Sequence, residues 1–193
     1  MFAPGVTEFI AQDTKALALY GQATWNFAEA WNLTAGLRYS DEEKDFDKSA
    51  VCANGQSSAT QLRCSNAQTA YTTARKDSWS NVSYRLALDY GLSDNTLIYG
   101  SASTGFKSGG FNGRGAITVS AAGLVTDTIT TVDEENVRSF EIGLKTEGED
   151  RSWRANLNYY YNDYSDLQLS AINSTGAFVL QNAADVTNLR RRS

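Results

Sequence analysis

The feature that most constrains this chain is an alternation of apolar and polar residues with period two. In 31–40, the residues that share one face of an extended chain are Trp31, Leu33, Ala35, Leu37 and Tyr39. The same alternation recurs in 16–25, 81–90, 139–145 and 153–162, less regularly in 96–106, and a seventh segment is expected from 178 towards 186. Such alternation over about ten residues predicts half-buried β-strands, longer than the ~5–6 residues usual in soluble sheets.

The expected connections between these segments differ in length. Short turns are expected near 26–30, 91–95 and 147–151, long polar connections at 43–78 and 107–136, and an intermediate one at 165–177. In outer-membrane β-barrels the short turns face the periplasm and the long loops face outward, and a single-chain barrel closes on an even number of strands. We therefore interpret the chain as all-β: an antiparallel transmembrane β-barrel segment, about seven strands of a larger barrel, with long extracellular loops and short periplasmic turns.

Aromatic residues lie near the ends of the apolar face. Those expected at the lipid interface are Trp25, Trp31, Tyr39, Tyr90, Trp153 and Tyr161. Eight residues separate Trp31 from Tyr39, and eight separate Trp153 from Tyr161. This spacing is roughly 26 Å of strand. At a tilt of about 40° this gives about 20 Å of depth, a little less than the ~25 Å apolar band of such barrels. The opposite face is expected to line the lumen with Arg38, Arg85, Asp89, Glu141, Lys145 and Arg154.

The pairing register of two hairpins can also be predicted. In the first hairpin, aligning the two tryptophans that flank the turn places Tyr20 opposite Gly36. A tyrosine ring over a bare glycine is a known pairing device in barrels. In the third hairpin, Leu144 is expected opposite Ala155. Both registers keep the apolar side chains on one face.

Composition excludes several classes of function. The chain of 193 residues contains no histidine, which removes Ser-His and Cys-His catalysis and histidine metal sites. We therefore expect neither an enzyme nor a bound cofactor. The net charge of -5 disfavours nucleic acid as a partner. No apolar run is long enough for a transmembrane helix.

Cys52 and Cys64 both fall in the connection expected at 43–78. In an exported chain they fit an extracellular disulfide, which would stabilise a loop of this size by about 3 kcal/mol. Two free thiols are the alternative.

The same connection begins with an acidic run, which consists of Asp41, Glu42, Glu43, Asp45 and Asp47. These carboxylates could bind Ca²⁺, but Lys44 and Lys48 lie between them and favour a solvated loop base. We expect no metal site.

Four ordered motifs carry a resemblance to a known family. LYGQAT (19–24) followed by LTAGLRY (33–39) resembles a barrel hairpin of TonB-dependent outer-membrane receptors. LIYGSASTGFKSGGFN (97–112), FEIGLKTE (140–147) and NYYYNDYSDLQ (158–168) are similar to later strands of the same barrel. Each motif alone is moderately specific, but the ordered set, over roughly 16–186, is highly specific.

The resemblance implies a receptor that takes up a scarce ligand, most often a ferric siderophore, with energy supplied by the TonB complex through a plug domain. It implies outer-membrane lipid around a barrel of about 22 strands. The motifs of the plug and of the TonB box are absent from 1–193, so we expect these residues to be a partial barrel. Ligand selection would fall to 43–78 and 107–136, and the ligand-binding residues cannot be named.

One alternative is a small self-contained outer-membrane barrel that acts as an adhesin or anchor. It requires an eighth strand, which would have to come from 6–12 and pair with the seventh. A soluble sandwich is a weaker alternative, because it has no use for apolar faces of this length.

Overall fold

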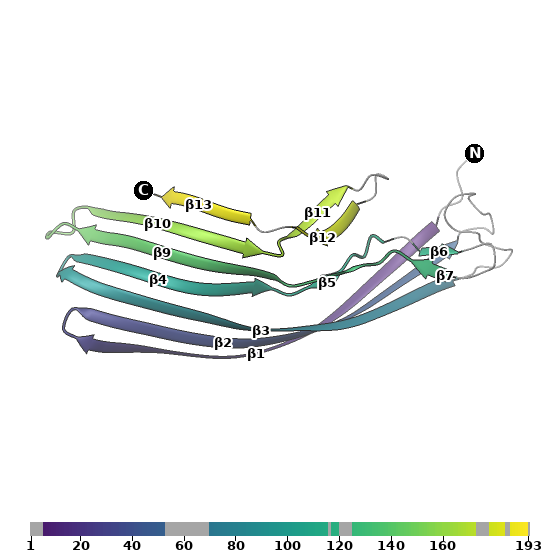
Figure 1. Ribbon diagram of the computed structural model, residues 1–193, viewed down its shortest axis with the longest axis horizontal. Helices are drawn as coiled ribbons and strands as arrows, with labels where there is room; N and C mark the ends of the chain where they lie inside the picture. The colour runs from purple at the N-terminus through teal and green to yellow at the C-terminus, as the bar shows by residue number, and fades with distance from the viewer. Residues whose placement is uncertain are drawn as a thin grey trace.

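The computed structural model describes residues 6–52, 70–115, 117–119, 125–172, 178–183 and 186–192. These residues form strands and their connections, and among them no helix is long and apolar enough to cross a membrane. The main element is a seven-stranded antiparallel sheet in the order β1-β2-β3-β4-β9-β10-β13 (Figure 1). Its strands are β1 (Val6–Ala28), β2 (Trp31–Cys52), β3 (Ala70–Ser93), β4 (Thr96–Lys107), β9 (Glu135–Glu147), β10 (Arg154–Ser165) and β13 (Val186–Arg192).

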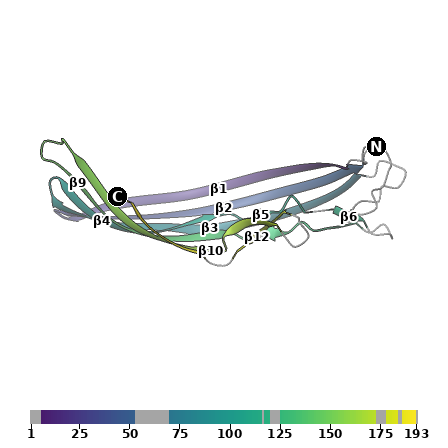
Figure 2. The same ribbon diagram turned by 90° about the horizontal axis from the view of Figure 1, so that it is seen from above.

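Three small two-stranded sheets lie at the loop end. They pair β5 (Gly110–Phe111) with β8 (Thr131–Val132), β6 (Ile117–Val119) with β7 (Val125–Asp127), and β11 (Gln168–Ile172) with β12 (Phe178–Asn182). The short turns of the main sheet all lie at its other end (Figure 1). The sheet curves, and β1 to β3 extend well beyond their neighbours towards the loops (Figures 1 and 2). The antiparallel all-β fold expected from the alternation is confirmed, and the described sheet is open, with β1 and β13 at its edges.

The register divides the sheet into two faces. The apolar face carries Trp31, Leu33, Leu37 and Tyr39 of β2, and their directly opposed partners on β3 are Tyr90, Leu88, Tyr84 and Val82. The polar face carries the intervening residues. Apolar-face side chains are exposed to an unusual degree, for example 76% for Leu19 and 58% for Ile142. An apolar face this long and uncovered is typical of a surface that meets lipid.

The extent of the first long loop is corrected. The expected connection 43–78 is largely strand, because β2 continues to Cys52 and β3 begins at Ala70. Beyond Tyr39 the alternation of apolar and polar residues no longer indicates a strand, because most residues on both faces are polar. Ladder pairing continues and is joined by ion pairs such as that between Lys76 Nζ and Glu43 Oε1 (2.8 Å).

The seventh strand is also corrected. Residues 178–182 do not join the main sheet but form the β11–β12 hairpin, and β13 takes the seventh position beside β10. Residues 6–12 do not provide an eighth strand, since they continue β1 and pair with β2 from Cys52 to Phe46. The self-contained eight-stranded alternative therefore loses the strand on which it depended.

Both predicted registers are wrong by two residues. Arg38 lies opposite Tyr20, because a bulge between Asn26 and Ala28 moves the turn. In the third hairpin Leu144 pairs with Leu157. Since side chains alternate with period two, an even displacement leaves every residue on its assigned face.

Candidate functional site

The polar face collects the charged residues that sequence analysis grouped together. Ladder partners place all of them on this face: Arg38, Arg85, Asp89, Glu141, Lys145 and Arg154. They are spread along the face rather than gathered in one cluster.

A hydrogen-bonded group lies in the middle of the polar face. The Tyr99 hydroxyl donates to Glu141 Oε1 (2.6 Å), and Asn158 Nδ2 donates to the same oxygen (3.0 Å). The Tyr99 ring covers Gly143, where any Cβ would collide with ring atoms. The tyrosine-over-glycine pairing expected at residues 20 and 36 is thus found here instead, while Gly36 faces Gln22.

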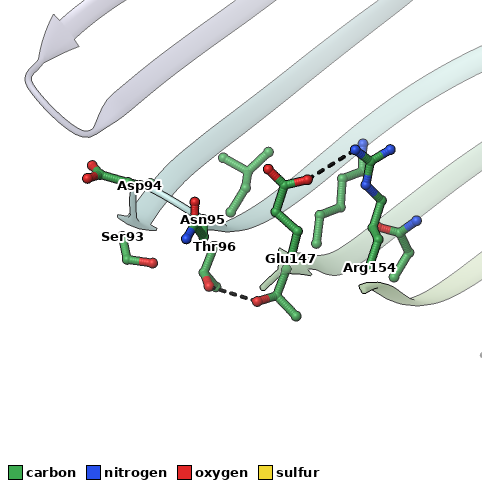
Figure 3. Close-up of a pocket in the computed structure, with 11 residues that line it drawn as sticks. Ser93, Asp94, Asn95, Thr96, Glu147 and Arg154 are labelled. Atoms are coloured by element: carbon green, nitrogen blue, oxygen red, sulfur yellow. Dashed lines mark hydrogen bonds and ion pairs between the residues drawn. The ribbon is translucent and has the colours of Figure 1, made fainter. Parts of the chain in front are cut away.

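A hollow of about 480 Å³ lies at the turn end of the polar face. Figure 3 shows Glu147 and Arg154 pointing toward one another, with Arg154 Nη2 3.0 Å from Glu147 Oε2. The Thr96 and Thr146 hydroxyls share a hydrogen bond of 2.9 Å on the other face of the same strands, the face of Leu144 (Figure 3). On the polar face, a cationic and an anionic side chain thus meet at the edge of this hollow.

At the loop end, the polar face is covered by two described stretches of one segment, residues 108–115 and 127–133. Phe46 of β2 and Trp79 of β3 are buried against Phe111 and Ile129 of that segment. The Phe111 ring centroid lies 5.5 Å from that of Phe46 and 6.0 Å from that of Trp79. This aromatic cluster is the buried core of the described chain, and it fixes the second long loop onto the first three strands.

Two lysines of the predicted acidic loop base complete this attachment. Lys44 Nζ donates to Ser108 Oγ (2.8 Å) and to the carbonyl of Gly109 (2.6 Å), and pairs with Glu42 (3.0 Å). The hydrogen bond from Ser108 is the main cause of the lowered pKa of Glu42, with Lys44 assisting against burial.

Lys48 is more deeply enclosed, with a side-chain exposure of 0%. Its Nζ donates to the carbonyls of Gly113 (3.1 Å) and Gly115 (2.7 Å) and pairs with Glu8 (3.0 Å). All three ammonium donors are therefore used. The expectation of a solvated loop base is wrong for these two lysines, because backbone carbonyls of the distant loop enclose them.

A third attachment joins β3 to the end of β7. Arg75 Nη2 contacts both carboxylate oxygens of Asp127 (2.9 and 2.7 Å), and Thr73 donates to the same group (2.8 Å). Burial opposes ionisation of Asp127, but hydrogen bonds from Thr73 and the Ile129 backbone, and the Arg75 charge, hold its pKa below the ordinary value.

On the apolar face, the aromatic residues of the turn end form a continuous row. Ring centroids are 5.6 Å apart for Trp25 and Phe27, 6.2 Å for Phe27 and Trp31, and 4.5 Å for Trp31 and Tyr90. Sequence analysis missed Phe27, because it follows the last alternating residue and its position depends on the bulge.

The other expected interface aromatics lie apart from this row. Trp153 belongs to the turn before β10, and Tyr161 approaches Phe140 on the opposite half of the sheet (6.4 Å between centroids). Tyr39 lies opposite Leu19 and Val82.

The acidic run alternates between the faces. On the apolar-face side, Glu43 Oε1 pairs with both Lys15 (3.3 Å) and Lys76 (2.8 Å), and Lys76 also contacts Asp45 (3.4 Å). The hydrogen bond from Lys76 is the main cause of the lowered pKa of Glu43. In the described part of the chain, no three acidic or cysteine side chains are grouped to hold a metal ion. Cys64 and the Cys52 side chain lie outside the described residues, so the disulfide stays a prediction.

These features define a class of protein. An open antiparallel sheet with one lipid-type face, one charged face, short turns at one end and a folded loop at the other is a segment of an outer-membrane β-barrel.

Comparisons with known proteins agree. The family described as "TonB dependent receptor-like, beta-barrel" matches residues 2–190. The chain belongs to this family, whose members are transporters of the bacterial outer membrane rather than enzymes.

Two solved structures show the same fold. The ferric yersiniabactin uptake receptor FyuA from Yersinia pestis matches with a TM-score of 0.69 and 18% identity, over 95% of this chain and 24% of that one. The ferric-catecholate import receptor Fiu from K12 E. coli matches with a TM-score of 0.60 and 16% identity, over 89% and 24%. The chain thus spans about a quarter of the length of these receptors.

Proposed function

We propose that the complete protein is a receptor for a ferric siderophore, which it takes up through the outer membrane with energy from the TonB complex acting on a plug domain. The observation that carries the proposal is the pairing of an exposed apolar face with a charged opposite face over one sheet of long strands. Family membership supports it, as do the uptake functions of FyuA and Fiu. The barrel would require no bond chemistry of its own.

In this proposal the apolar face meets lipid. Its interface aromatics are those of the turn-end row together with Tyr39, Trp153 and Tyr161. The polar face lines the lumen. Residues 108–115 and 127–133 would then cover the inside of the barrel mouth on the extracellular side, where they would help to form the entrance for ligand.

An iron-uptake assay tests the proposal. The complete gene product would be expressed in a host that lacks its own siderophore receptors, and uptake of ⁵⁵Fe-loaded yersiniabactin and of a ⁵⁵Fe catecholate chelate would be measured. We expect one chelate to be accumulated, and accumulation to be lost when the host lacks TonB. A product that assembles in the outer membrane but imports neither chelate would contradict the siderophore assignment. Uptake that persists without TonB would contradict the energy source.

A further inference from the structure

A second hollow on the polar face lies nearer the loops than the one in Figure 3. It has a volume of about 310 Å³ and crosses β1 to β4. Its floor includes the backbone of Gly36, which has no side chain and lies beside the side chain of Gln22. Arg38 and Arg85 stand on its rim, and Ser83 and Ser103 are their ladder partners.

The charge of this hollow is one-sided. None of the residues that line it is acidic, although the whole chain carries a net charge of -5. Arg38 and Arg85 occupy diagonal positions of one ladder, roughly 7 Å apart at the backbone, where like charges repel. An arrangement that brings two cations together without an acid between them favours an anion as its occupant.

Neither arginine is held in an ion pair by the acids near it in the described part of the chain. Arg38 Nε donates to Ser40 Oγ (2.9 Å), which leaves the two terminal nitrogens of its guanidinium available. Arg85 is attracted by the charged Glu141 carboxylate, which accepts hydrogen bonds from Tyr99 and Asn158 and makes no ion pair with Arg85. Among the described residues, neither arginine has an ion pair.

A further cation lies on the loop side of this hollow. The adjoining hollow, of about 680 Å³, shares Arg38 and adds the exposed Lys107. The acid on its polar-face side, Glu42, is already bound by Lys44 and Ser108. Lys107 has Glu135 as its ladder partner, so the positive charge without a directly opposed acid is that of Arg38 and Arg85.

We propose that Arg38 and Arg85 form a carboxylate-binding site on this face. Planar guanidinium groups match the two oxygens of a carboxylate, and the serine hydroxyls on the rim can donate to the same group. The inference rests on the proposed function, because the polar face must line the lumen. The carboxylate can come from a soluble anionic ligand or from an acidic side chain elsewhere in the same receptor.

The test measures charge at Ser103, beside Arg85. In the complete receptor with Cys52→Ser and Cys64→Ser, the thiol introduced by Ser103→Cys would be modified in outer-membrane vesicles by anionic and cationic methanethiosulfonates of similar size. We expect the anionic reagent to react about tenfold faster, and Arg38→Gln with Arg85→Gln to bring the two rates together. The control is Asn156→Cys, which lies among the mixed charges of the turn-end hollow. The ratio of its reaction rates with the anionic and cationic reagents should not change when the two arginines are replaced.

Two further results identify the source of the carboxylate. Protection of the introduced thiol by added citrate indicates a soluble ligand. An introduced thiol that reacts with neither reagent until the arginines are replaced indicates an acidic segment of the receptor. Equal rates for the two reagents, a ratio insensitive to both arginines, or a thiol that stays unreactive after their replacement would overturn the proposal. None of these readouts depends on iron uptake, so the failure of that assay would be a separate result.

Discussion

Replacing Lys48 by methionine should release residues 108–115 from the strands. The variant loses the two ammonium hydrogen bonds to the carbonyls of Gly113 and Gly115. Hydrogen bonds to a charged group contribute about 1.5–3 kcal/mol each, so the low end of that range gives about 3 kcal/mol. At about 1.4 kcal/mol per factor of ten, the opened population of the loop rises roughly a hundredfold.

Limited trypsin digestion of the receptor on intact cells measures this opening. Arg114 lies in the attached loop, and cleavage after it tracks the open population when opening is fast relative to cleavage. Glu8→Gln should have a smaller effect than Lys48→Met, because the Glu8 side chain is already 44% exposed and keeps its contact with water. Lys15→Met, at an exposed ion pair on the other face, should leave cleavage after Arg114 unchanged. Equal cleavage in wild type and Lys48→Met, at equal levels of assembled receptor, would refute the reasoning.

The two faces and the attached loop lead to three more predictions. Leu157→Arg places a charge on the lipid face, which costs about 2–4 kcal/mol. The amount of folded receptor in the outer membrane should therefore fall much more than for Asn156→Arg on the opposite face. Equal losses would contradict the assigned faces. Gly143→Ala should lower the thermal unfolding temperature in detergent because its Cβ collides with the tyrosine ring above it, whereas Gly36→Ala makes only ordinary contacts and should change it little; the reverse order would count against that packing. The pKa of Asp127 is lowered in the folded loop, so its contribution to attachment is present above the ordinary carboxyl pKa of 3.8 and is lost as the pH falls below that value. Proteolysis of the loop with an acid-active protease should therefore rise on acidification. The rise should be smaller in Asp127→Asn, because attachment in that variant is already weakened at neutral pH.

Much of the membrane part of the fold could be predicted from the sequence. Alternation in 31–40 and 81–90 assigns faces because lipid and lumen impose opposite polarities on neighbouring side chains. Register could not be predicted to better than two residues, since a displacement of that size leaves the polarity of both faces intact. The bulge beside Phe27 carries no signal in hydrophobicity.

The loop end was less predictable for a different reason. Lys44 and Lys48 are surrounded by acids in the sequence and look solvated, but their oxygen ligands come from residues 65 and 67 positions further along the chain. Trp79 likewise lies in a polar stretch and is buried by a loop that no local pattern connects with it. Long-range contacts of this kind have no periodicity from which they could be inferred.

Successive residues of each strand alternate between the two faces, and this alternation limits how the length of such a chain can change in evolution. Inserting or deleting one residue between Phe140 and Leu144 would turn the side chains beyond it, so that Glu141 or Lys145 would enter the hydrocarbon. Insertions or deletions of two residues avoid this reversal. Odd changes can be accommodated where the ladder is already irregular, as between Asn26 and Ala28. Lineages of this barrel should therefore differ freely in length at the loops and bulged turns, and in steps of two within the membrane.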